Sequence, residues 1–98
     1  MNLTIVAGAR PNFMKIAPII HEINRIKKHN SFINYRLIHT GQHYDQNMSD
    51  SFFKQLNIPS PHINLNCGSG SQAEITSSIM ISFEKELIKN KPDLVLVV

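Results

Sequence analysis

The chain has 98 residues, of which 42% are apolar and 17% are charged, and it contains no tryptophan. A chain of this length forms one small domain at most, or a part of a larger one. Ten basic and seven acidic residues give a net charge of +3, which is mild for a nucleic-acid binder and suits an anionic small molecule equally well. The single cysteine, Cys67, excludes an internal disulfide and a multi-cysteine zinc site.

Membrane and nucleic-acid partners are not expected. No apolar run approaches the length that crosses a bilayer, and the N-terminal residues lack the basic start and apolar stretch of a signal peptide. The basic residues are scattered and form no nucleic-acid motif. These features predict a cytoplasmic protein with neither kind of partner.

The first predicted elements are a strand and a helix. Residues 3–7 (LTIVA) are rich in β-branched side chains and end at Gly8, which predicts a strand buried on both faces. In the following helix, Asn12 is the expected N-cap and Pro18 is expected to introduce a kink. The expected apolar face of this helix consists of Ile16, Ile19, Ile20, Ile23 and Ile26.

Strand and helix patterns continue to alternate along the chain. Residues 33–40 and 63–65 predict strands, and residues 47–56 predict a short helix in which the phenylalanines belong to the core. Residues 72–90 predict a longer helix, and residues 94–98 predict a fourth strand. The apolar stripe expected on the longer helix consists of Ile75, Ile79, Met80, Phe83 and Leu87.

This alternation predicts an α/β fold, with a parallel Rossmann-like sheet and helices on both of its faces. The final aliphatic run has no cap or charged tail behind it, and an open strand edge of that kind favours pairing with further strands. We therefore expect residues 1–98 to be part of a larger doubly wound domain.

One candidate site follows the first strand. In a doubly wound sheet, ligands bind beyond the carboxyl ends of the strands. There Gly8 permits close backbone approach, the helix N-terminus attracts anions, and Arg10 and Lys15 supply positive charge. Gly8, Arg10 and Lys15 are therefore candidate phosphate-binding residues. An equally plausible interpretation is that the two cations are solvated loop and helix charges.

A second candidate loop follows the second strand. It contains Gln42 and His43, and His43 is a candidate hydrogen-bond donor or general acid or base. Satisfaction of backbone groups at the turn is the favoured interpretation for His39 and an equally plausible one for His43. Because no carboxylates complete a ligand set, we expect no metal site. Cys67 is expected to be an ordinary thiol, Glu74 a solvated helix charge, and residues 68–71 a flexible turn.

Several motifs together resemble the non-hydrolysing UDP-N-acetylglucosamine 2-epimerases. They occur in the family's order across the whole chain, and the fullest is GARPNFMKIAP at residues 8–18. The others are TGQH at 40–43, INL at 63–65, EIT at 74–76 and KPDLVLV at 91–97. The resemblance implies a GT-B fold of two Rossmann-like lobes, of which this chain would be the first half of the N-terminal lobe.

The resemblance also implies an activity. Members of this family interconvert UDP-GlcNAc and UDP-ManNAc without a cofactor, for cell-surface polysaccharide biosynthesis, and the full-length proteins are homodimers. Arg10 and Lys15 match positions that contact UDP, whereas Gln42 and His43 match a loop near the substrate. The family's catalytic acids lie beyond Val98, so residues 1–98 alone are expected to be inactive. Allosterically activated members carry a basic residue near Ser69, which this chain lacks.

Three alternatives remain open at this stage. A hydrolysing UDP-GlcNAc 2-epimerase shares the fold, although its signature reads more like R-A-D-Y/F-G than the sequence at residues 10–14. Another GT-B nucleotide-sugar enzyme, such as a glycosyltransferase, is the second alternative. The third is a non-catalytic nucleotide-binding remnant.

Overall fold

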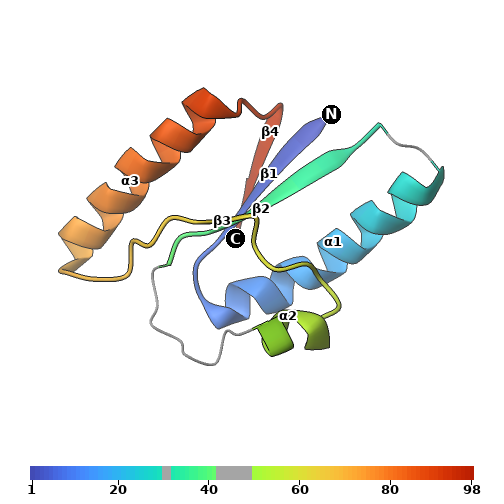
Figure 1. The fold of residues 1–98 in the computed structure, drawn as a ribbon, viewed down its shortest axis with the longest axis horizontal. Helices are drawn as coiled ribbons and strands as arrows, with labels where there is room; N and C mark the ends of the chain where they lie inside the picture. Colours follow the sequence, from blue (N-terminus) through green and yellow to red (C-terminus); the bar gives the residue numbers. More distant parts are fainter. Residues whose placement is uncertain (30–31, 42–49) are drawn as a thin grey trace.

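The computed structural model covers residues 1–98 and describes residues 1–29, 32–41 and 50–98. Four parallel strands form one sheet in the order β3-β2-β1-β4, with α1 and α2 on one side and α3 on the other (Figure 1). This arrangement confirms the predicted α/β fold. The elements are β1 (Asn2–Ala7), α1 (Arg10–His29), β2 (Asn34–His39), α2 (Asp50–Gln55), β3 (Ile63–Asn64), α3 (Gln72–Lys89) and β4 (Leu94–Val97).

Strand β1 lies at the centre of the sheet and is covered on both faces. Leu3, Ile5 and Ala7 belong to the hydrophobic core that includes α1, and Thr4, which points to the opposite face, is also buried. The predicted doubly buried strand is therefore confirmed. Because β2 flanks β1 on one side and β4 flanks it on the other, the direction of strand addition reverses beside β1.

Helix α1 begins earlier than predicted, and Asn12 is not its N-cap. The helix starts at Arg10, so Asn12 lies within its first turn. Proline is favoured in a first helical turn, and Pro11 is the sequence signal for this earlier start. The helix also continues through Pro18, which it contains as an internal residue.

The buried face of α1 also differs in part from the predicted one. Ile19 and Ile26 are exposed, which corrects their assignment to the core face. The buried stripe instead includes Phe13 and Ala17, whose positions the isoleucine spacing did not reveal, and consists of Phe13, Ile16, Ala17, Ile20 and Ile23.

The short helix α2 packs against the first half of α1 (Figure 1). Phe52 and Phe53 are buried, as predicted, and their rings meet edge to face at 5.4 Å between centroids. The ring of Phe13 lies 6.4 Å from Phe52 and 5.2 Å from Phe53. Beyond α2, the Leu56 carbonyl accepts a 2.8 Å hydrogen bond from Nε2 of His21. Aromatic packing and this bond fix the α2 segment to α1.

Helix α3 begins with a capping box rather than a flexible turn. Ser71 is the N-cap, its hydroxyl accepts from the Glu74 amide, and the Glu74 carboxylate accepts from the Ser71 amide. These bonds lower the pKa of Glu74, since they favour its ionised form. Glu74 is exposed, as predicted, but it has a structural role that the prediction did not include. Glu74 closes the first turn of the helix.

Helix α3 packs less tightly than α1 does, and no residue of α3 is buried. Met80 is 67% exposed, so its predicted place in the core stripe is wrong, whereas Ile75, Ile79, Phe83 and Leu87 are partly buried. A polar contact adds to this packing, because Arg36 of β2 forms a 2.6 Å ion pair with Glu86 of α3. None of the helices described here is long and apolar enough to span a membrane.

Candidate functional site

The candidate site lies at the carboxyl end of β1, beside the reversal in strand order. Strand β4 pairs with β1 in parallel, so the carboxyl ends of both strands lie at the same edge of the sheet. On the other side, the Thr40 amide donates a 3.0 Å hydrogen bond to the Ala7 carbonyl. The chain therefore leaves β1 and β2 at adjacent points of this edge, as predicted. Such a reversal is the usual ligand crevice of an open α/β sheet.

The loop after β1 is closed by Asn12. Its side-chain oxygen accepts hydrogen bonds from the amides of Gly8 at 3.2 Å and Ala9 at 2.8 Å. These two amides would otherwise be available to an anion at the helix N-terminus. A phosphate group at this turn would have to compete with Asn12 for them. Charged side chains must therefore supply more of any anion binding here than the sequence suggested.

Arg10 lies at this edge of the sheet, in the first turn of α1. Its Cζ lies over the Phe52 ring, 4.7 Å from the ring centroid, and the residue is exposed. Across residues 1–29, 32–41 and 50–98, no carboxylate forms an ion pair with Arg10. Within that part of the chain, no acidic side chain competes with an external anion for the Arg10 guanidinium.

Lys15 does not extend from the same side of the helix as Arg10. The two residues are five positions apart, which separates their directions around the helix axis by about 140°. Lys15 is exposed, and its Cα–Cβ bond tilts toward the helix N-terminus, as in any α-helix. The structure thus places both cations near one helix end, but it does not bring them into one cluster.

The loop after β2 is fixed by a buried histidine. Nδ1 of His39 accepts a 3.0 Å hydrogen bond from the Gly41 amide, which confirms that His39 satisfies a backbone group at the turn. Burial lowers the pKa of His39 by disfavouring its charged form. Its ring also meets Phe13 edge to face at 5.1 Å. Gln42 and His43 lie outside the described residues.

Gly41 is required at this turn for two reasons. Its φ of +76° is a conformation that other residues rarely adopt. A Cβ atom at this position would also lie 2.8 Å from the Asn66 Cα and 2.7 Å from the Asn64 side-chain oxygen. The chain segment after β3 therefore packs directly against Gly41.

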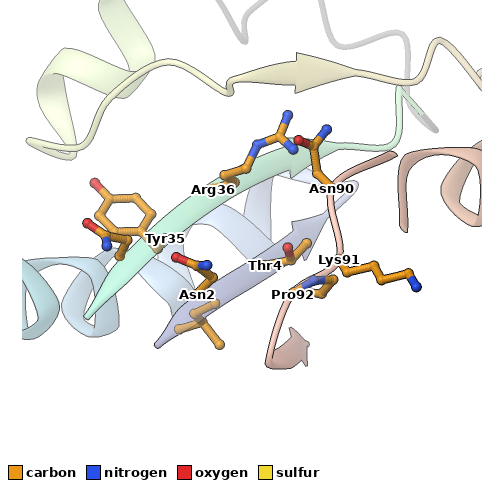
Figure 2. Close-up of a pocket in the computed structure, with 9 residues that line it drawn as sticks. Asn2, Thr4, Tyr35, Arg36, Asn90, Lys91 and Pro92 are labelled. Carbon is orange, nitrogen blue, oxygen red and sulfur yellow. The ribbon is translucent and has the colours of Figure 1, made fainter. Parts of the chain in front are cut away.

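A hollow of about 250 Å³ lies elsewhere in the protein, at the amino-terminal halves of β1 and β2. Figure 2 shows Arg36 and Asn90 pointing toward one another beside it, while Lys91 points away. Nδ2 of Asn90 and the Arg36 guanidinium both bind the Glu86 carboxylate, so the charge of Arg36 is already compensated. This hollow is remote from the carboxyl ends of the strands and is not the predicted site.

The fold and this site define a class of protein. A parallel sheet with a strand-order reversal, and with an arginine beside it, is typical of Rossmann-like lobes that bind nucleotides. A profile of the UDP-N-acetylglucosamine 2-epimerase family matches residues 24–98, and the chain belongs to this family. Its sheet corresponds to the N-terminal Rossmann-like lobe of the family's GT-B fold.

Individual relatives agree with this assignment. A UDP-N-acetylglucosamine 2-epimerase of Methanocaldococcus jannaschii is 44% identical over 97 residues, which are 99% of this chain and 25% of the relative. A UDP-2,3-diacetamido-2,3-dideoxy-D-glucuronate 2-epimerase of Pseudomonas aeruginosa is 36% identical over 97 residues, covering 99% of this chain and 26% of the relative.

A solved structure is also similar over almost the whole chain. The crystal structure of Methanocaldococcus jannaschii UDP-GlcNAc 2-epimerase in complex with UDP-GlcNAc and UDP superposes with a TM-score of 0.86 at 44% identity. The similarity covers 99% of this chain and 25% of that protein. The chain thus spans about a quarter of the length of the relatives that it matches.

Proposed function

We propose that this chain forms part of the UDP site of an enzyme that interconverts UDP-GlcNAc and UDP-ManNAc. The observation that carries the proposal is the position of the Arg10 guanidinium at the carboxyl end of β1, beside the strand-order reversal, where no carboxylate of residues 1–29, 32–41 or 50–98 pairs with it. The similarity to an epimerase structure that is described as a complex with UDP-GlcNAc and UDP supports it.

In the proposed reaction, UDP is eliminated from the sugar and then added back with the opposite configuration at C2. Elimination removes the C2 proton and breaks the bond between C1 and the diphosphate oxygen, which leaves a 2-acetamidoglucal and a UDP anion. Arg10 suits this step, since a planar guanidinium can bind two phosphate oxygens and stabilise the charge that develops on them. Lys15 would add a second positive charge from the other flank of α1. Gly8 allows the backbone to approach the diphosphate closely.

Other residues of the proposed enzyme lie outside this part of the site. Gln42 and His43 remain predicted substrate-loop residues, and the acidic catalytic groups are expected beyond Val98. The chain would then be a partial N-terminal lobe of a cytoplasmic homodimer that serves polysaccharide biosynthesis.

A second candidate substrate is UDP-2,3-diacetamido-2,3-dideoxy-D-glucuronate. The observation that favours it is the 36% identity to the Pseudomonas aeruginosa epimerase named for that sugar. Both substrates carry the same UDP group, so Arg10 and Lys15 would act identically on either. Turnover of the two UDP-sugars by a protein that contains both lobes distinguishes the candidates.

Titration of UDP into the chain tests the proposed site. Loss of charge-assisted hydrogen bonding in Arg10→Ala should weaken binding by about 1.5–3 kcal/mol. Arg25→Ala is the matched control. Arg25 lies on the same helix and is exposed like Arg10, but it is paired with Glu22. We expect calorimetry or NMR titration to show unchanged affinity in the control. Equal affinity of Arg10→Ala and the unsubstituted chain would remove Arg10 from the site.

An activity assay tests whether residues 1–98 catalyse the proposed reaction without the rest of the enzyme. We expect purified residues 1–98 to produce no UDP-ManNAc from UDP-GlcNAc, since the proposed catalytic acids are not among them. Product formation above a no-protein control, measured by chromatography, would contradict this expectation.

A further inference from the structure

The aromatic ring beneath Arg10 belongs to a residue that the sequence analysis assigned only to the core. Phe52 is buried, and the Arg10 guanidinium carbon lies 4.7 Å from its ring centroid. The two residues are 42 positions apart and come from different helices, α1 and α2. No local sequence pattern could have paired them.

The contact with Phe52 restrains the flexible Arg10 side chain but leaves its N–H donors free of the ring. An arginine over an aromatic face is attracted by the negative charge density of the ring, which accepts none of the in-plane N–H bonds. A guanidinium held in this way loses less side-chain entropy when a ligand binds. The remaining hydrogen-bond fork still matches a phosphate group.

The ring of Phe52 is itself held from several sides. Phe13 and Phe53 both meet it edge to face, at 6.4 and 5.4 Å between centroids. Phe13 also contacts His39, whose Nδ1 accepts from the Gly41 amide in the second loop. One aromatic cluster thus supports Arg10 on one side and the loop that leads to Gln42 on the other.

We propose that Phe52 is a positioning residue that holds the Arg10 guanidinium toward the diphosphate of the nucleotide. This inference rests on the proposed function, because it needs Arg10 to bind UDP. It predicts that the Phe52 ring affects ligand affinity through Arg10 alone. The neighbouring ring of Phe53, which is equally buried but is not the ring beneath Arg10, affects stability only.

The test compares Phe52→Leu with its matched control, Phe53→Leu. Both variants lose one buried ring of the same cluster, so we expect similar decreases in thermal midpoint. Phe52→Leu should also weaken UDP binding by about two- to fivefold, the range that one cation–π contact provides. Phe53→Leu should bind UDP as the unsubstituted chain does, and Phe52→Tyr should restore affinity because it keeps the ring. Equal affinities of the two leucine variants would overturn the inference.

A second measurement does not depend on UDP or on the leucine variants. In NMR spectra of the unliganded chain, the side-chain protons of Arg10 should show an upfield ring-current shift. Phe52→Met should abolish that shift and Phe53→Met should retain it, whereas an unchanged shift in Phe52→Met would overturn the inference.

The two proposals can fail independently of one another. If Arg10→Ala leaves UDP affinity intact, the proposed site is wrong, but if it weakens binding while Phe52→Leu does not, only the role of Phe52 is wrong.

Discussion

The two faces of the sheet are covered in different ways. Against α1 and α2, the sheet packs side chains that are fully buried, such as Ile5, Phe13 and Leu37. Against α3 the sheet presents the buried Ile38 together with Thr4 and Arg36, but no residue of α3 itself is buried. The first face depends on apolar packing, and the second depends more on an ion pair and a capping box. The candidate site is built on the tightly packed face, where a rigid core can hold Arg10 in place.

The largest expected difference between the faces is in the free energy of unfolding that is lost when one aromatic ring is removed from each face. Phe13 is 0% exposed, so Phe13→Ala should lower the free energy of unfolding by about 3–5 kcal/mol. Phe83→Ala on α3 should cost distinctly less, because Phe83 is only partly buried and the surroundings can close over the gap. Urea denaturation measures both values. Equal losses would show that α3 is packed as tightly as α1.

The ion pair on the α3 face should contribute more than a surface pair does. The Glu86 side chain is 12% exposed and accepts from both Arg36 and Asn90, so Glu86→Gln should cost about 1.5–3 kcal/mol. Glu22→Gln is the control, because the Glu22–Arg25 pair is fully exposed and water screens it, so its loss should change stability little. If the two substitutions lower the denaturation midpoint equally, the Arg36–Glu86 pair is no more than a surface contact.

The capping box gives a smaller expected effect on the same face. Ser71→Ala removes the N-cap acceptor of α3 and should destabilise the chain by about 1 kcal/mol. Ser69→Ala, two residues earlier, should leave the thermal midpoint unchanged, since Ser69 is exposed and does not cap the helix. A destabilisation by Ser69→Ala as large as that by Ser71→Ala would indicate that the whole turn contributes, rather than the cap.

The smallest expected effect is the pH dependence of stability that His39 causes on the α1 face. Burial lowers the pKa of His39 below its ordinary value of 6.5, so the unfolded chain binds a proton more readily than the folded chain does. Stability should therefore be complete above pH 6.5 and decrease as the pH falls from 6.5 toward the lowered value. Denaturation midpoints of the unsubstituted chain and His39→Asn across this range measure the contribution. If the midpoint of His39→Asn depends on pH as strongly as that of the unsubstituted chain, other titrating groups cause the pH dependence.

Sequence patterns identified the elements well and their packing less well. The apolar runs at β1 and β4 and the helix at residues 72–90 were correctly predicted, because period and propensity are local properties. Asn12 and Met80 were assigned wrongly, since spacing alone does not show where a helix begins or how deeply a helix face is buried. Residues 33–40 were predicted as a strand, but the close approach of the following Gly41 to Asn66 depends on a segment 25 residues further along.

The sequence by itself determined the alternation of strands and helices, the loops that follow the strands, and the family to which these motifs belong. Local chemistry is sufficient for these features, because backbone propensity and a short motif act within a few residues. Tertiary structure alone decided that the Phe52 ring lies beneath the Arg10 guanidinium and that the segment at Asn66 packs against Gly41. These contacts depend on how separate elements pack in space, which no spacing along the chain encodes.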